Sequence, residues 1–211
     1  MRWFSLDASV IDWDETTYLL GARALLEGKS LYVDVWDFKP PGIFWLLAGL
    51  ESLFDNAIVP LRVLGVLLIS LTAFFISRIS FSLAPKQPVA GFMAGLFFVS
   101  AISFNSFNNG LARGYGLEIN TEHFFLLFTC ATFYLVARFP KHVALHGLAG
   151  LLLGLGFIIK YFVLVDFVVL CYAITVLGQR DERVRWLAFP AGTQWQESTG
   201  TGSAQRIFRA G

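Results

Sequence analysis

The sequence predicts an all-α membrane protein, a polytopic bundle of transmembrane helices. Apolar residues make up 56% of the 211-residue chain and charged residues only 15%, against about 45–50% and about 25% in ordinary globular proteins. The mean hydropathy is +0.63. After residue 57, moreover, the apolar residues form long runs, and most of the charged residues stand between those runs. Runs of this kind are typical of membrane-spanning helices, which need about 20 predominantly apolar residues each.

The composition also excludes several other classes of protein. The formal net charge is +1, so a basic surface for nucleic acid is not expected. The high apolar content excludes a disordered or collagen-like chain. Cys130 and Cys171 both lie inside apolar runs, and they are predicted to be small buried hydrophobic residues without a disulfide or metal spacing.

The first 56 residues are predicted not to cross the membrane. Charged residues interrupt every apolar run in residues 1–41. A helix is expected over residues 15–28, with Gly28 as its stop. Residues 39–42, Lys-Pro-Pro-Gly, form a rigid turn, because the prolines fix φ and remove two donors. Residues 43–54 are apolar but short and have acids near their end, which favours an interfacial or re-entrant helix.

The remaining apolar runs predict five spans, at about 57–77, 89–106, 121–138, 143–159 and 161–178. A single helix over the last two runs would be about 54 Å long, whereas the hydrocarbon core is about 30 Å thick. It would also bury Lys160 near the midplane, at a cost of about 2.5–3.5 kcal/mol. We therefore expect a break near Lys160, which places its amine at an interface.

Positive charges near the ends of the spans predict the orientation of the bundle. Loops rich in Lys and Arg stay in the cytoplasm. We therefore assign to the cytoplasmic side the loops that contain Arg78, Lys86, Arg138, Lys141 and positions 180–185. The outer side then receives the acids Asp12, Asp14, Glu15, Glu118 and Glu122. Residues 1–41 lie outside in this arrangement, so either they cross unaided or an earlier span is missing.

Three regions follow from this arrangement. Residues 1–56 form an outer first loop with the acidic motif and interfacial helices, and residues 57–186 form the transmembrane bundle. Residues 187–211 are a polar tail rich in Gly, Thr, Ser and Gln, which is expected to be disordered. This tail is either an ordinary flexible terminus or the point at which the reading frame is broken.

The first candidate site is the run Asp12-Trp13-Asp14-Glu15. A carboxylate there could act as general base on an acceptor hydroxyl, and Asp-x-Asp could hold a divalent cation through oxygen ligands. The alternative is helix capping, because Asp12 followed three residues later by Glu15 resembles a capping box, and acids favour the positive end of a helix.

Cationic residues beside apolar runs form the other candidates. Lys39, held by its stiff turn, suits a lipid phosphate, or it is an interfacial lysine whose amine reaches water. Lys160 is a functional candidate because ionisable groups in membrane segments are costly; alternatively it pairs with Asp166, or both anchor at interfaces. Glu122, at the mouth of its span, and Arg113, in the preceding loop, complete the set; each also suits a structural role.

Three stretches of the chain together resemble a known family of membrane glycosyltransferases. They are "DWDETTYLLGARALLEGKSLYVDVWDFKPPGIFWLL", "NTEHFFLLF" and "GLLLGLGFIIKY". The chain resembles the protein-mannosyltransferase and aminoarabinose-transferase type over residues 8–178. The resemblance implies a fold of the C-type glycosyltransferase class, with short interfacial helices on an outer loop. It also implies a multi-pass protein of the inner or plasma membrane whose acidic loop faces the periplasm or the extracellular space.

The resemblance further implies what the site residues do. The family transfers a sugar, with inversion, from a polyprenyl-phosphate donor to an acceptor hydroxyl on a lipid, glycan or protein. Asp14, with Glu15 beside it, matches the catalytic acid of the family's outer loop. Lys39 matches a lysine near the donor phosphate, where cations would stabilise the departing charge. Glu122 matches a second outer acid and Lys160 a lysine after the Gly-rich span, here assigned to the donor phosphate. Arg113 as a further cation for the donor phosphate and Asp12 as a further outer acid complete the candidate set.

Two departures from the family pattern lead to a further expectation. Only eleven residues precede the acidic motif where a first span is expected, and family members usually continue for several more spans. We therefore expect an incomplete member with little or no transferase activity on its own, which robust turnover would contradict. No cofactor is implied beyond the divalent cation considered above. The alternative function is a small transporter or lipid-binding membrane protein, with Lys160 and Asp166 lining a substrate path.

Overall fold

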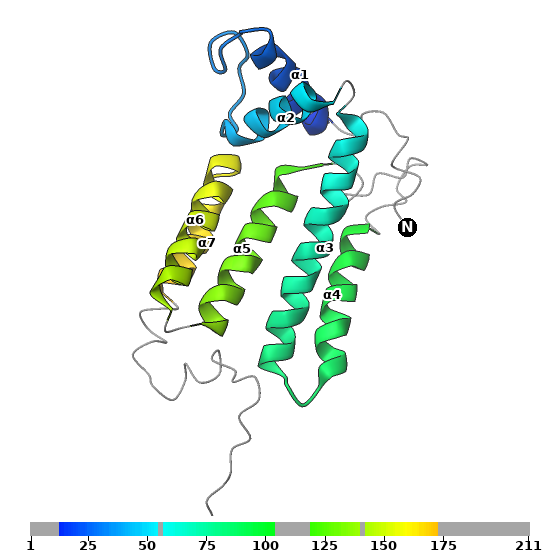
Figure 1. The fold of residues 1–211 in the computed structure, drawn as a ribbon, viewed down its shortest axis with the longest axis vertical. Coiled ribbons are helices and arrows are strands. Elements are labelled where there is room, and N and C mark those ends of the chain that lie inside the picture. Colours follow the sequence, from blue (N-terminus) through cyan, green and yellow to red (C-terminus); the bar gives the residue numbers. More distant parts are fainter. Residues whose placement is uncertain (1–12, 55–56, 104–118, 140–141, 173–211) are drawn as a thin grey trace, which may run out of the picture.

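The structure is a computed structural model that describes residues 13–54, 57–103, 119–139 and 142–172. These ranges contain seven helices and no strand (Figure 1), which confirms the predicted all-α class. The helices are α1 (Trp13–Leu26), α2 (Gly42–Leu53), α3 (Ile58–Leu83), α4 (Pro88–Ser103), α5 (Thr121–Arg138), α6 (Val143–Ile159) and α7 (Val163–Tyr172).

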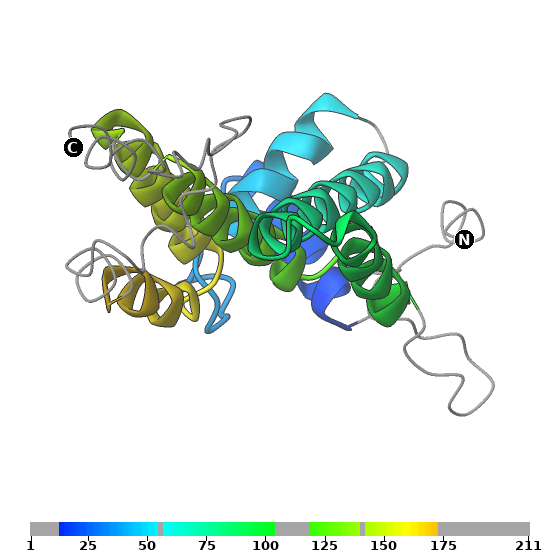
Figure 2. The ribbon, with the colours of Figure 1, turned by 90° about the horizontal axis from the view of Figure 1, so that it is seen from below.

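The long helices stand side by side, and the two N-terminal helices cover one end of them. Packing contacts join α4 to α3, α3 to α5 and α5 to α6, and α7 lies against α5 and α6. Figure 2 shows this group from the end opposite to α1 and α2. Helices α1 and α2 pack on each other, and α2 also contacts α6 (Figure 1). The fold therefore has an elongated bundle and a small cap made from the first part of the chain.

Each of the five predicted spans has a helix at the corresponding place. The end predicted for the first one at residue 77 is wrong, because α3 continues to Leu83 and is followed by Ala84. A charge such as that of Arg78 does not end a helix, since a long side chain can reach polar surroundings; Pro85 does, because it restricts the residue before it. Of the described helices, α3 alone is long and apolar enough to cross a membrane, and α2, α4, α6 and α7 are apolar but shorter.

The predicted break at Lys160 is confirmed. Helix α6 ends at Ile159, Lys160 has an extended backbone with φ −150° and ψ 125°, and α7 begins at Val163. The backbone N–H of Lys160 still donates to the carbonyl of Gly156, at 2.8 Å. The chain therefore turns back at this point and leaves the amine at the end of the bundle.

The cap also agrees with the sequence in its main features. Helix α1 begins at Trp13, slightly before the predicted start, and ends at Leu26; Gly28 then adopts a left-handed φ of 82°, as a helix stop requires. Helix α2 occupies the predicted interfacial segment. A Cβ on Gly42 would lie 2.7 Å from the carbonyl oxygen of Ile158, so only glycine allows the Lys-Pro-Pro-Gly turn to approach the end of α6 this closely.

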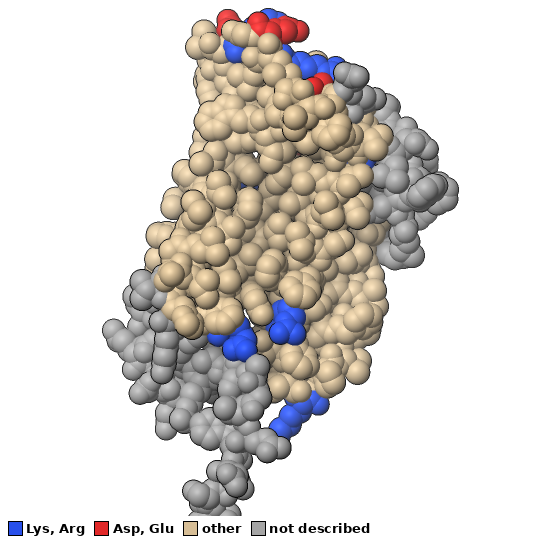
Figure 3. All heavy atoms as spheres, in the orientation of Figure 1, with Lys and Arg blue, Asp and Glu red and all other residues tan. Residues whose placement is uncertain are grey.

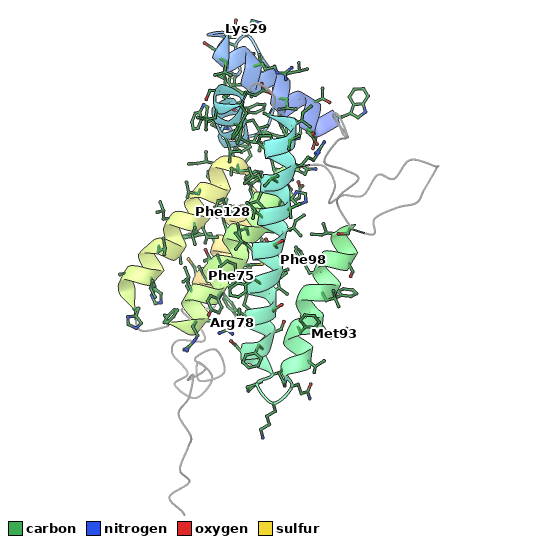
Figure 4. The ribbon with its side chains drawn as sticks, turned by 45° about the vertical axis from the view of Figure 1, so that its right-hand side comes forward. Lys29, Phe75, Arg78, Met93, Phe98 and Phe128 are labelled. Atoms are coloured by element: carbon green, nitrogen blue, oxygen red, sulfur yellow. The ribbon has the colours of Figure 1, made fainter. Side chains whose placement is uncertain are left out.

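The surface of the bundle is apolar between its two ends. In Figure 3 the red acidic atoms gather at the end formed by α1 and α2, and tan atoms fill most of the length below. Large apolar side chains point outward along α4 and α7, including Phe97 with 74% exposure and Val165 with 61%. Arg78 lies toward the far end of α3, whereas Lys29 lies at the α1 end (Figure 4). This surface exceeds what a soluble monomer usually leaves open and favours a lipid environment.

The cysteines show the limit of the hydropathy pattern. Cys130 is only half-buried and Cys171 is exposed, and neither forms a disulfide, so the prediction of buried cysteines is wrong for Cys171. The physical reason is that an apolar run gives the same signal whether a residue faces other helices or the outside of an apolar bundle.

Two glycines allow α3 and α4 to approach closely. Gly91 and Gly95 are buried in α4, one turn apart. A Cβ on Gly95 would lie 2.1 Å from Ser77 Oγ and 2.9 Å from the Ala73 carbonyl oxygen on α3. Small residues four apart are a common device by which membrane helices bring their backbones together.

Replacing Gly95 with alanine is therefore expected to destabilise the protein by about 1–3 kcal/mol, the usual cost of overpacking. Thermal unfolding in detergent would measure this as a lower Tm. Gly154→Ala is the matched control, because a Cβ there meets nothing within 4 Å. Equal melting temperatures for the two variants would contradict the proposed tight contact.

Candidate functional site

Two acid–lysine pairs lie at the capped end of the bundle. Asp14, in the first turn of α1, places Oδ1 2.8 Å from Nζ of Lys39. Glu122, in the first turn of α5, forms an ion pair with Lys160 at the end of α6. The structure thus brings to one end four residues that lie far apart in the sequence.

The loop between α1 and α2 positions Lys39. The Tyr32 hydroxyl donates to the Lys39 carbonyl at 2.7 Å, and the Lys39 N–H donates to Oδ1 of Asp37 at 2.9 Å. Tyr32 itself has a left-handed φ of 70°, and its N–H donates to the Val35 carbonyl at 2.7 Å. The Lys39 side chain is 13% exposed, so a tight turn holds a largely buried cation.

Tyr18 lies at the centre of the first pair. Its side chain is fully buried, and the Lys39 amine donates to its hydroxyl at 2.6 Å. The same hydroxyl lies 3.3 Å from Oδ2 of Asp14 and 3.4 Å from Oδ1 of Asn120. Burial, and then the negative charge of Asp14, raise the pKa of Tyr18, which keeps the phenol neutral and able to donate.

The start of α5 joins the two pairs. Asn120 is the N-cap residue and accepts a hydrogen bond from the Thr121 N–H at 2.8 Å. The Thr121 hydroxyl donates to Oε2 of Glu122 at 3.2 Å, and the buried His123 ring completes a capping box with Asn120. Polar contacts therefore run from Lys39 through Tyr18, Asn120, Thr121 and Glu122 to Lys160.

A second, buried ion pair fixes α1 to the bundle. Both guanidinium NH groups of Arg62 on α3 donate to the Glu15 carboxylate, at 2.6 and 2.7 Å. The N–H of Ile119 also reaches Oε2 of Glu15, at 3.3 Å. The side chains of Glu15 and Arg62 are 0% and 1% exposed. Glu15 thus has no open side on which to meet a substrate.

Of the other predicted residues, Asp12 and Arg113 fall outside the described residues, so only Asp14 of the Asp-x-Asp cation site is described. Within the described ranges no three His, Cys, Asp or Glu side chains are grouped to hold a metal ion. Asp166 accepts a hydrogen bond from Thr129 at 2.7 Å, and Lys160 pairs with Glu122, so the alternative of a Lys160–Asp166 pair is wrong.

The sequence prediction misses several residues of this site, among them Tyr18, Asn120 and Arg62. Tyr18 stands four residues after Asp14, and this spacing places both on one helix face. Asn120 precedes a helix at a typical N-cap position. Arg62 lies inside an apolar helix, and a cation in such a place needs an acidic partner. The neighbouring residues in the sequence do not indicate which acid that partner is.

Comparison with known proteins gives one match. The model of the dolichyl-phosphate-mannose-protein mannosyltransferase family matches residues 38–191, which is more than half of the chain. No curated protein and no solved structure matches the chain. The matched range contains Lys39, Glu122 and Lys160 and begins after Asp14 and Glu15. In the first acid–lysine pair, Asp14 therefore lies before the matched range and Lys39 lies inside it.

Proposed function

The chain belongs to the dolichyl-phosphate-mannose-protein mannosyltransferase family, and on this premise we propose that it transfers a sugar to an acceptor hydroxyl at the capped end of the bundle. The family consists of membrane-associated glycosyltransferases of the polyprenyl-phosphate-mannose type. Within the proposal the donor is a polyprenyl-phosphate-linked sugar, the acceptor stands on the outer face of the membrane, and the reaction inverts the anomeric carbon.

One observation carries the proposal: two acid–lysine pairs are joined by a short polar network. Transfer from a lipid phosphate needs a base for the acceptor hydroxyl and positive charge for the departing phosphate. Asp14 is 42% exposed and Lys39 lies 2.8 Å from it, so both requirements are met within one pair. Lys160, held by Glu122, adds a second cation at the same end.

The proposed reaction is a single displacement. The acceptor oxygen attacks the anomeric carbon while Asp14 takes the hydroxyl proton, and the bond between that carbon and the phosphate oxygen breaks. The electron pair of this bond leaves with the polyprenyl phosphate, whose added negative charge Lys39 and Lys160 stabilise. Attack opposite to the leaving group inverts the configuration.

Glu15 and Glu122 receive supporting roles in this proposal. Glu15 anchors the start of α1 to Arg62 and thereby positions its neighbour Asp14. Glu122 positions Lys160 in the same manner. Asp12 and Arg113 remain predictions, the first as a further acid and the second as a further cation for the donor phosphate.

The surface properties of the bundle support a multi-pass arrangement with the cap outside. Exposed apolar side chains along α3, α4, α6 and α7 suit contact with lipid. Arg78 and Arg138 lie at the end opposite to Asp14, as the tendency of cations to stay in the cytoplasm requires. Transporters keep their binding residues near the midplane, whereas the acid–lysine pairs lie at one end, which favours the transferase over the transporter.

Replacing Lys39 with methionine is expected to weaken the binding of a polyprenyl phosphate by about 10–100-fold, because a hydrogen bond to a charged group contributes about 1.5–3 kcal/mol. Binding is measured with the chain in lipid nanodiscs. Lys29→Met is the matched control, since Lys29 lies at the same end of the molecule and its amine pairs with Glu27 on the surface. Equal affinity for wild type and Lys39→Met would refute the donor site.

A further inference from the structure

We propose that Tyr18 is a positioning residue that holds Lys39 while Lys39 exchanges the Asp14 carboxylate for the phosphate of the donor. This inference rests on the proposed function, since it concerns how the donor engages the same site. It also assigns a role to a residue that the resemblance does not include.

Lys39 is already paired with one anion, the Asp14 carboxylate, and a donor phosphate would compete with it. In the structure the amine contacts Oδ1 of Asp14 at 2.8 Å and the Tyr18 hydroxyl at 2.6 Å, and it lies 4.4 Å from the centre of the Tyr18 ring. A lysine has three donors, and its flexible stem allows the amine to move. A donor phosphate that needs Lys39 must therefore draw the amine away from Asp14.

Tyr18 is suited to be the fixed partner in this exchange. Its side chain is fully buried, and its ring packs edge-on against Phe44 with 5.9 Å between the ring centres and 82° between their planes. The hydroxyl therefore cannot follow the lysine. It can keep one hydrogen bond from the ammonium while its own proton turns to Asp14 or to Asn120, both within 3.4 Å.

The exchange connects donor binding to the readiness of the base. While Lys39 contacts Asp14, the carboxylate is engaged in an ion pair. Once the phosphate takes the lysine, that carboxylate can accept a hydrogen bond from the acceptor hydroxyl, and Tyr18 keeps it oriented. The acceptor is then activated only when the donor is present, which protects the site from unproductive proton transfer.

The test compares the binding of a polyprenyl phosphate to wild type and to five variants of the whole chain in lipid nanodiscs. Asp14→Asn removes the internal competitor, so we expect the affinity to rise by about three- to tenfold, the effect of one net hydrogen bond. Tyr18→Phe keeps the ring but removes the hydroxyl, so we expect a fall of about the same size. Glu51→Gln is the control, because Glu51 is also an ion-paired carboxylate in the cap, bound to Arg23, and we expect no change.

The affinity of the double variant Tyr18→Phe/Lys39→Met is compared with that of Lys39→Met alone. The titrations extend to lipid concentrations high enough to saturate the weakened site. A residue that acts through Lys39 has no further effect there, whereas a merely structural residue lowers the affinity equally in both backgrounds and would overturn the assignment. If Lys39→Met binds as well as wild type, the proposed function fails. If Lys39→Met weakens binding but Asp14→Asn does not strengthen it, or Glu51→Gln strengthens it equally, the exchange alone is wrong.

Discussion

Replacing Asp14 with asparagine is expected to lower the rate of sugar transfer by about 10²–10⁴-fold, the usual contribution of a positioned general base. Asparagine has almost the same size as aspartate, and its single side-chain oxygen can still accept a hydrogen bond from Tyr18 or Lys39, but it cannot take up the proton of the acceptor. Because the variant is also expected to bind the donor phosphate at least as well as wild type, the loss should appear in the chemical step.

Single-turnover kinetics would measure this effect, with the protein in excess over a radiolabelled polyprenyl-phosphate sugar in membranes. This format detects slow transfer, which suits the low activity expected from the sequence. Glu51→Gln, which removes a paired carboxylate from α2, should leave the rate unchanged. A rate for Asp14→Asn equal to that of wild type would identify another base, and a wild-type chain without any transfer would contradict the proposed activity.

The second large effect concerns stability. Arg62→Met is expected to destabilise the protein by about 3–5 kcal/mol, because removing one partner of a buried ion pair leaves the other charge without compensation. Here that charge is Glu15, whose side chain is 0% exposed. The loss should fall mainly on the attachment of α1 to the bundle, since Glu15 joins α1 both to α3 and to the backbone of Ile119.

Thermal unfolding in detergent measures the change, and the double variant Glu15→Gln/Arg62→Met is its matched control. The glutamine carries no charge and can still accept the Ile119 N–H, so most of the lost stability should return. A double variant as unstable as Arg62→Met alone would mean that packing of the arginine, and not its charge, supports α1. In that case the anchoring role of Glu15 would have to be withdrawn.

Much of the fold is predictable from local patterns along the chain. The five apolar runs, the glycine that stops α1 and the break at Lys160 each depend on a few neighbouring residues, and the structure shows helices and turns at these places. The end of α3 is predicted less well, because Arg78 interrupts the apolar run although no helix breaker precedes Pro85.

The candidate site is only partly accessible to the same reasoning. Alternating helix directions suffice to predict that Asp14, Lys39, Glu122 and Lys160 share one end of the bundle. Their pairing is not predictable in this way, and the nearer acid Asp166 is an equally reasonable partner for Lys160 until the helices are placed. In the sequence, Tyr18 stands out only as one position of the apolar face of a helix. In the structure, however, its hydroxyl contacts three polar groups.

Hydropathy and turn chemistry thus suffice to establish an all-helical, lipid-suited chain with its acids and site lysines at one end, because these properties depend on neighbours within a few residues. Tertiary folding alone decides which charges meet. Glu15 and Arg62 are brought together from α1 and α3, and Lys39 reaches Asp14 from a turn that Gly42 allows to rest on the end of α6. Contacts between distant segments depend on how helices pack, and no local pattern of residues carries that information.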